Sequence, residues 1–281
     1  MISPQRAISE IQENFSSIKW WRDRVFLPFM IGPFTRFYPK YPGYNEAVHV
    51  MNKEWDTAII LDACRADIFE EVVDTGVFNS YSSAVSLGSH SSEWTRRNFV
   101  GQTFDETVYV SANPHTTLLA NGTFHELIEV WKEYDTVPNE INPGEMVEIA
   151  VEAHQRHPSK RLIVHFMQPH GSGGLVTEEG SREQRYRLTI ERVLEHVFEL
   201  DGSIDGKTVI TADHGELFNT GIRKKLGFDT HVPRLRFPEL VNVPWAELNG
   251  DRRDVTAGTA STTDTDTDEV EERLRDLGYR T

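Results

Sequence analysis

Short apolar runs rich in β-branched residues recur along the middle of the chain, separated by longer stretches of mixed polarity. Four runs are typical of strands buried on both faces of a parallel sheet: 57–61, 107–111, 162–166 and 208–211. Apolar residues at helical spacing predict helices over 143–155 and 182–200. This alternation predicts an α/β fold in which helices cover both faces of a mostly parallel sheet, a three-layer α/β/α sandwich.

The two ends of the chain depart from this pattern. Residues 1–54 are predicted to form an N-terminal helix and an aromatic, basic arm, residues 55–249 the α/β domain, and residues 250–281 a flexible acidic linker with a short C-terminal helix. Residues 18–41 of the arm mix Trp, Phe and Tyr with five basic residues and one acidic residue. The arm either packs its aromatic side chains on the domain or lies on an anionic membrane surface.

The charge of the chain excludes some partners. With 44 Asp and Glu against 29 Lys and Arg, the formal net charge is −15, and only 8 of the basic residues are Lys. An acidic surface poor in lysine predicts a protein that works in high salt, as in a halophilic archaeon. The same charge argues against nucleic acid as a partner, because binding phosphates requires clustered Lys and Arg.

Cysteine content and hydropathy indicate which kinds of site and which cellular compartment to expect. The single cysteine, Cys64, excludes an intramolecular disulfide and a Cys-rich zinc module. No run approaches 18 apolar residues, and the first 30 residues lack the basic start and apolar stretch of a secretion signal. We therefore expect a cytoplasmic protein, with membrane association only through residues 18–41.

Polar residues follow or interrupt the predicted strands, at the edge where parallel α/β sheets bind ligands. Asp62 follows the first strand, and Asp213 and His214 follow the last in the segment TADHGE, which offers carboxylate and imidazole ligands to a divalent cation. Ser91 would begin a helix in GSHSSEW, where the helix dipole stabilises an anion. Each residue alone also has a structural explanation: Asp62 or Ser91 as a helix cap, and His165 as a hydrogen-bonded core residue.

Taken in order, the segments WDTAIILDACRAD, GSHSSEW, HFMQPH and TADHGE, then His231 and VNVPW, resemble the alkaline phosphatase and sulfatase superfamily, especially its sulfatase-like and lipoteichoic-acid-synthase-like branches. The resemblance covers residues 55–245, and the terminal EVEERLRDLGY is similar to the tail of many sulfatase-like proteins. It implies an alkaline phosphatase-like fold and a metal-dependent enzyme that hydrolyses phosphate or sulfate esters.

The resemblance also implies a metal site. The ligands of one divalent cation would be Asp62, Ser91, Asp213 and His214, with Ser91 as the nucleophile that forms a covalent seryl ester. Two carboxylates, a hydroxyl and an imidazole suit Mn²⁺ or Zn²⁺ better than Mg²⁺, and the imidazole disfavours Ca²⁺.

Four further residues receive roles from the same resemblance. His170, in a glycine-rich turn, and His231 would bind the equatorial oxygens of the ester group or protonate the leaving group. Arg65 and His165 would bind the substrate. Together with the cation, these side chains would form a local positive site inside an acidic protein.

The chain also departs from the family pattern. Two-metal phosphatases of the superfamily have Asp and His where this chain has His170 and Gly174, so we expect one metal ion rather than two. Sulfatases carry a C/S-x-P-x-R motif whose first residue becomes formylglycine; here Ser92 has Arg96 at the right distance, but Trp94 stands in place of Pro. Phosphate esters are therefore favoured over sulfate esters.

Three functional hypotheses follow. The first is a hydrolase of phosphate or sulfate esters, carried on a small molecule, a glycan or a lipid. The second is a transferase that moves a phospho-headgroup to a glycan or lipid. The third is a non-catalytic metal-binding protein that keeps the sulfatase-like fold. The substrate remains open at this stage, as does the choice between Ser91 and Ser92 as nucleophile.

Overall fold

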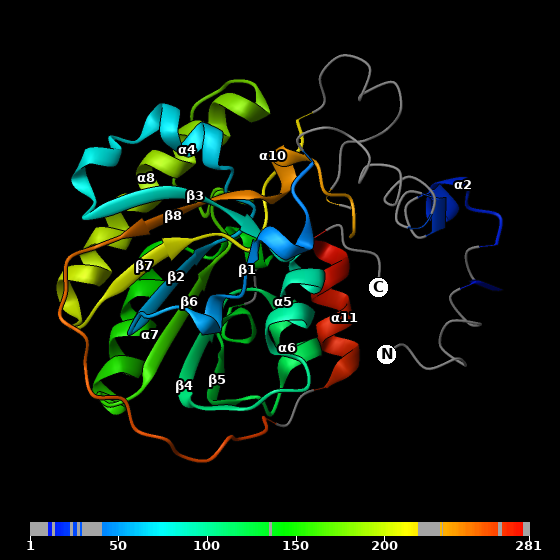
Figure 1. Ribbon diagram of the computed structural model, residues 1–281. Helices are drawn as coiled ribbons and strands as arrows, with labels where there is room; N and C mark the ends of the chain where they lie inside the picture. Colours follow the sequence, from blue (N-terminus) through cyan, green and yellow to red (C-terminus); the bar gives the residue numbers. More distant parts are fainter. Residues whose placement is uncertain are drawn as a thin grey trace.

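A single eight-stranded sheet organises the protein (Figure 1). The computed structural model describes residues 41–134, 137–218, 231, 233–263 and 266–277, together with 11, 12, 15–22, 25, 26 and 29. The strand order is β1-β3-β8-β7-β2-β6-β4-β5, and all neighbours are parallel except the two pairs that include β8. The strands are β1 (Ala47–Val48), β2 (Thr57–Leu61), β3 (Ser80–Ser86), β4 (Phe104–Ser111), β5 (Phe124–Glu129), β6 (Arg161–Phe166), β7 (Thr208–Thr211) and β8 (Asn242–Glu247).

Helices lie on both faces of this sheet. They are α4 (Ala66–Val72), α5 (Ser91–Phe99), α6 (Pro114–Ala120), α7 (Pro143–Arg156), α8 (Arg182–Ser203), α10 (Pro238–Val241) and α11 (Thr267–Asp276), with the short α2 (Ile18–Trp21) in the arm. In Figure 1, α4, α7 and α8 lie on one side of the sheet, and α5 and α6 on the other. The helices predicted over 143–155 and 182–200 are confirmed as α7 and α8.

The side chains of β2 show how one strand serves both faces. Ile59 and Leu61 belong to the hydrophobic core that includes the buried faces of α4, α7 and α8. Ala58 and Ile60 belong to a second core, formed with α5 and α6. Because successive side chains in a strand point to opposite faces, a strand buried on both faces is mostly apolar, as residues 58–61 of this one are. The predicted three-layer sandwich with a mostly parallel sheet is confirmed.

The four predicted strands are confirmed as β2, β4, β6 and β7, which are neighbours at the centre of the sheet. The other four strands escaped the apolar pattern because their sequences are short, polar or interrupted. Residues of β3 such as Ser80, Ser82 and Ser83 are exposed, so its sequence is mostly polar. Pro244 interrupts the sequence of β8, the antiparallel strand between β3 and β7. Central, doubly buried strands are therefore readable from sequence, while half-exposed ones are not.

The segment after β8 runs along the sheet edge where the parallel strands begin (Figure 1). The backbone N–H groups of Thr256 and Ser261 donate hydrogen bonds to the carbonyl oxygens of Ser159 and Phe124. The segment leads into α11, whose Val270 and Leu274 are buried in the core. None of the helices in the described ranges combines the length and hydropathy needed to cross a bilayer.

Candidate active site

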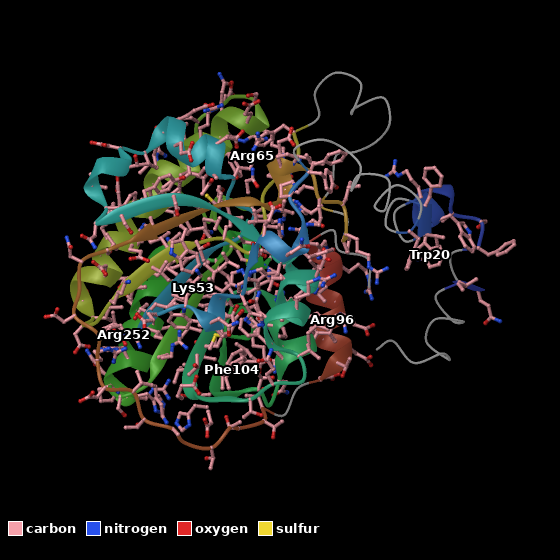
Figure 2. All side chains as sticks on the ribbon, viewed as in Figure 1. Trp20, Lys53, Arg65, Arg96, Phe104 and Arg252 are labelled. Carbon is pink, nitrogen blue, oxygen red and sulfur yellow. The ribbon has the colours of Figure 1, made fainter. Side chains whose placement is uncertain are left out.

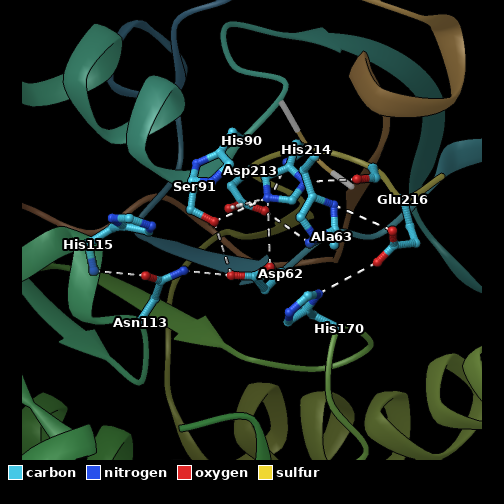
Figure 3. Close-up of polar contacts among 12 residues, drawn as sticks. Asp62, Ala63, His90, Ser91, Asn113, His115, His170, Asp213, His214 and Glu216 are labelled. Atoms are coloured by element: carbon cyan, nitrogen blue, oxygen red, sulfur yellow. Dashed lines mark hydrogen bonds and ion pairs between the residues drawn. The ribbon is translucent and has the colours of Figure 1, made fainter. Parts of the chain in front are cut away.

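Four elements bring polar side chains together at the opposite edge, where the parallel strands end (Figure 3). Asp62 follows β2, His165 lies in β6, and Asp213 and His214 follow β7. Ser91 is the first residue of α5. The side chains of all five residues are fully buried. The sheet register explains the convergence, since β6 and β7 both pair with β2 and their last residues therefore lie level with its end.

Three of these residues form a cluster of metal-ligand type. The Nε2 atom of His165 lies 3.6 Å from Asp62 Oδ2 and 3.9 Å from Asp213 Oδ2. One ligand atom from each of the three residues can be chosen so that all lie within 4.8 Å of one another. Within the described part of the chain, no hydrogen-bond partner reaches Asp62 Oδ1, Asp213 Oδ2 or His165 Nε2. Because buried polar atoms are normally paired, three unpaired ligand atoms at one point fit a divalent cation.

His214 is oriented by its own turn. Its Nδ1 lies 2.7 Å from the Gly215 carbonyl oxygen, which can only accept, so Nδ1 carries the proton. The lone pair of Nε2 is therefore directed at the cluster, 3.4 Å from Asp213 Oδ2 and 3.1 Å from Ser91 Oγ. A bond from Nδ1 to a carbonyl oxygen is the usual arrangement of a histidine that binds a metal ion through Nε2.

Ser91 reaches the same point from α5. Its Oγ lies 3.4 Å from Asp62 Oδ2 as well as 3.1 Å from His214 Nε2. Its neighbour Ser92 points elsewhere, because the Ser92 Oγ and backbone N–H both bond His90 Nδ1, at 2.9 Å and 3.0 Å. The structure thus brings together the four predicted metal ligands and adds His165, which had been predicted to bind substrate.

The backbone around the cluster is strained and closely packed. Ala63 adopts a left-handed conformation, with φ of 60°, and its N–H donates to Asp213 Oδ1 at 3.0 Å. Tyr186, from α8, donates its hydroxyl to the Ala63 carbonyl oxygen at 2.6 Å and accepts from the Arg65 N–H at 2.9 Å. At Gly215 a Cβ would lie 2.1 Å from the Glu239 carbonyl oxygen, so the glycine of TADHGE is required by packing.

A second group of residues surrounds Glu216, next to the cluster. The Nδ1 atoms of His170 and His231 lie 3.6 Å and 3.5 Å from the two oxygens of this carboxylate, and Arg182 Nη2 lies 2.8 Å from one of them. The two imidazole rings are 5.0 Å apart between centroids. His170, Glu216 and His231 also have the spacing of a metal-ligand group. Glu216 and Arg182 had not been predicted as site residues.

Burial and neighbouring charge act differently on these groups. Burial would raise the pKa of Glu216, but His231, His170 and Arg182 lower it to about 2, so the carboxylate is ionised. Burial lowers the pKa of His231 to about 3, with His214 and His170 adding to the effect. Burial also opposes the charge on His170, yet Glu216 and Asp62 raise its pKa above the ordinary value. Glu216 and Asp62 therefore favour the protonated form of His170, whereas burial favours the neutral form of His231.

Asp62 is ionised for a similar reason. Burial raises its pKa, but His165, His214 and His170 outweigh burial and lower the pKa far below the ordinary value. Asn113, after β4, donates from Nδ2 to Asp62 Oδ2 at 2.6 Å and so fixes this carboxylate. Asn113 was not among the predicted site residues; its position two residues after a buried strand was the signal that could have identified it.

Arg65 lies one step away from the cluster. Its guanidinium forms two hydrogen bonds with Asp67, at 2.6 Å and 2.9 Å, and a third with the Glu216 carbonyl oxygen at 3.3 Å. The side chain is 13% exposed. Arg65 therefore contacts the backbone of the Glu216 group, and its predicted role in substrate binding stays a prediction.

No family model and no curated protein matches the chain. Solved structures similar to it include the carboxyl-terminal periplasmic domain of phosphoethanolamine transferase EptC from Campylobacter jejuni, at 11% identity over 68% of this chain and 77% of that one, with a TM-score of 0.42. The EptC domain from Escherichia coli in complex with Zn matches at 12% identity over 69% and 73%, with a TM-score of 0.46. A protein in the alkaline phosphatase superfamily from Vibrio parahaemolyticus matches at 11% identity over 72% and 62%, also with a TM-score of 0.46. Similarities of this size carry no functional argument, and the chemistry has to be argued from the residues of the site.

Proposed function

We propose that the protein is a metal-dependent hydrolase of phosphate or sulfate esters that acts through a covalent intermediate on Ser91. The observation that carries this proposal is the position of Ser91 Oγ, at the N-terminus of α5 and 3.1 Å from His214 Nε2, beside the cluster of unpaired ligand atoms. An oxygen in this position lies at the positive end of a helix dipole, which stabilises the negative charge of an attacking alkoxide.

The residues that would hold the cation are Asp62, Asp213, His214 and Ser91, joined by His165. Ligands about 2.0 to 2.2 Å from one ion lie roughly 3 to 3.6 Å apart, close to the separations found among these side chains. Two carboxylates with two imidazoles favour Zn²⁺ or Mn²⁺ over Mg²⁺ and disfavour Ca²⁺. When bound, such an ion supplies charge stabilisation to the ester group and lowers the pKa of the serine hydroxyl.

The reaction follows from the positions of the remaining groups. Ser91 Oγ attacks the phosphorus or sulfur atom, the new Oγ bond forms, and the bond to the leaving alcohol breaks. His170, whose pKa is raised chiefly by Glu216 against the effect of burial, carries a proton that it can give to the leaving oxygen. Water then attacks the seryl ester and releases phosphate or sulfate. One proton of that water returns to Ser91 Oγ, and solvent, which took up the Ser91 proton before the attack, returns one to His170.

The test compares two adjacent serines. With Zn²⁺ or Mn²⁺ added, the full chain should hydrolyse an aryl phosphate, and Ser91→Ala should lower kcat by at least about 10³-fold. Ser92→Ala is the matched control, because Ser92 bonds His90 and not the cluster, and it should keep most of the activity. A phosphoryl group found by mass spectrometry on Ser91 of the quenched enzyme would support the intermediate. An active Ser91→Ala protein would remove Ser91 as the nucleophile.

The same assay separates the related reactions. An aryl sulfate in parallel with the aryl phosphate shows which ester is preferred. An added acceptor alcohol distinguishes hydrolysis from transfer, since a transferase forms the ester of the added alcohol. A protein that binds the metal ion yet cleaves none of these esters would instead be a non-catalytic member of this fold.

A further inference from the structure

Exposed apolar side chains gather on the N-terminal arm. Among the described residues, eight large hydrophobic side chains are exposed, and five of them belong to the short stretch 11–29: Ile11, Phe15, Val25, Phe26 and Phe29. Phe15 is 72% exposed, Phe29 57% and Phe26 50%. The other three, Val77, Val100 and Phe198, are scattered over the α/β domain. We name these five residues of the arm the aromatic patch. Helix α2, which lies between Phe15 and Val25 in the sequence, is drawn clear of the sheet in Figures 1 and 2.

The charge of the arm is opposite to that of the rest of the chain. Residues 18–41 carry five basic residues and one acidic residue, hence +4, which leaves −19 on the remainder of a chain of net charge −15. Basic residues therefore accompany the aromatic patch in sequence, while acidic residues dominate elsewhere. An anionic surface would attract this segment and repel most of the protein.

The patch is attached to the segment that carries a site residue. The guanidinium carbon of Arg234 lies 4.6 Å from the centre of the Phe29 ring. The backbone N–H of Arg234 donates to Glu93 Oε2 at 2.8 Å, and Glu93 belongs to the first turn of α5, which begins with Ser91. His231 lies three residues before Arg234. A surface bound by the patch would therefore be near the Ser91 end of α5.

We propose that the aromatic patch, with the basic residues that accompany it in sequence, docks the protein onto an anionic lipid surface. A lipid interface offers both an apolar layer for Phe, Val and Ile side chains and anionic headgroups for Lys and Arg. A second copy of the chain offers an acidic domain to the basic residues, but among the described residues the exposed apolar side chains of that domain are scattered and form no apolar layer. Nucleic acid offers the charge without an apolar layer. Lipid matches both features, and this inference is independent of the proposed catalytic function.

Vesicle sedimentation tests the proposal with the full chain. Wild-type protein should bind vesicles of phosphatidylcholine containing phosphatidylglycerol more strongly than vesicles of phosphatidylcholine alone, at about 0.1 M salt. The triple variant Phe15→Ser, Phe26→Ser, Phe29→Ser should lower the partition coefficient by at least about 100-fold, because the apolar contribution is lost. A matched control, Val77→Ser with Phe198→Ser, removes exposed apolar side chains outside the patch and should bind like wild type.

Salt separates the two contributions. At 1 M salt the Debye length is only about 3 Å, so the preference for phosphatidylglycerol should shrink while binding through the aromatic side chains remains. Hydrolysis of a soluble aryl phosphate by the triple variant should equal that of wild type, so a lost catalytic function would not be mistaken for lost docking. Failure of wild type to bind either vesicle, or equal binding by the triple and control variants, would overturn the proposal. Self-association that depends on the three Phe residues, without vesicle binding, would identify a second copy as the occupant and overturn it too.

Discussion

A buried aspartate stands at each end of β2, and the two differ in almost everything but burial. Asp56 precedes the strand and Asp62 follows it, and both side chains are fully buried. Asp56 lies at the edge where the parallel strands begin, among backbone N–H groups and arginines. Asp62 lies at the edge where they end, among another carboxylate and several histidines. The comparison separates a charge that holds the fold together from one that we propose serves metal binding.

Asp56 is surrounded by hydrogen-bond donors and a cation, although its Oδ1, like that of Asp62, lacks a hydrogen bond among the described residues. Its Oδ2 accepts from the backbone N–H groups of Lys207 at 2.8 Å and Arg253 at 3.1 Å. Its Oδ1 lies 3.5 Å from Arg252 Nε. These contacts join β2 to the turn before β7 and to the segment after β8. Asp56 therefore ties three distant parts of the chain together, which is a structural role.

The surroundings of Asp62 differ in kind, because its neighbours are a second carboxylate, Asp213, and the imidazoles of His165 and His214. Its Oδ2 accepts from Asn113 and lies near Ser91, but among the described residues nothing bonds Oδ1. Asp213 Oδ2, in the same cluster, is unpaired in the same sense. Placing two partly unpaired carboxylates together costs free energy in the absence of a cation. A stable protein keeps such an arrangement where it serves binding or catalysis.

The largest expected effect comes from Asp62→Asn. This variant keeps the shape of the side chain but removes a charge from the cluster, so activity should fall by at least about 10³-fold, which corresponds to roughly 4 kcal/mol of transition-state stabilisation. Calorimetry of wild type should show a rise in Tm on addition of Zn²⁺, because at 100 times Kd a ligand adds about 2.7 kcal/mol of stability. Asp62→Asn should lose that rise.

The metal-free stability of Asp62→Asn is the control. Because the amide oxygen can still accept from Asn113, the unfolding free energy without metal should stay within about 1 kcal/mol of wild type. A variant that unfolds far more easily without metal, yet still gains stability from Zn²⁺ like wild type, would make Asp62 a structural residue like Asp56.

How much of this could be predicted depends on whether a signal is local in sequence. The central strands follow from the hydrophobic pattern, and the position of Asp62, Asp213 and His214 after those strands points to the edge where a site would lie. Their role as metal ligands was implied by the resemblance of the ordered motifs. Asn113 and Tyr186 do not, because their roles are contacts with Asp62 and Ala63 made across 51 and 123 positions of the chain. Tyr186 lies in the helix predicted over 182–200 from the spacing of apolar residues. That spacing does not show which hydrogen bonds the Tyr186 hydroxyl forms.

Asp56 escaped the sequence analysis for a related reason. A single aspartate before a strand carries no motif, and its partners Lys207, Arg252 and Arg253 come from segments that the hydrophobic pattern treats as turn and linker. The pattern indicates which elements form and roughly where a site lies. It does not show which distant backbone groups complete a buried charge.

A smaller effect, on stability alone, is expected from Asp56→Ala. This substitution removes the buried acceptor of two backbone N–H groups and the ion-pair partner of Arg252. The unfolding free energy should therefore fall by about 3 kcal/mol. Activity per folded molecule should match wild type, because Asp56 lies at the far end of β2 from Ser91. Urea unfolding, followed by fluorescence, measures the first quantity and an assay at low temperature the second. A stable but inactive Asp56→Ala protein would show that Asp56 serves the reaction rather than the stability of the fold.

The smallest effect is expected from Tyr186→Phe. This substitution acts at the Asp62 end of β2 but changes none of the proposed metal ligands. The Tyr186 hydroxyl donates to Ala63 O at 2.6 Å, and Ala63 is the left-handed residue between Asp62 and the next helix. Removing the hydroxyl deletes two hydrogen bonds, to the Ala63 carbonyl oxygen and from the Arg65 N–H, so the unfolding free energy should fall by about 2 kcal/mol. Because the Ala63 turn orients both Asp62 and, through its N–H, Asp213, the variant should also need more Zn²⁺ for half-maximal activity. Tyr81→Phe is the matched control, since its hydroxyl bonds Glu70 at the surface and the same atom is deleted. An unchanged zinc requirement in Tyr186→Phe, with the stability loss present, would mean that the turn holds its shape without the tyrosine and that the ligand geometry is set by the sheet alone.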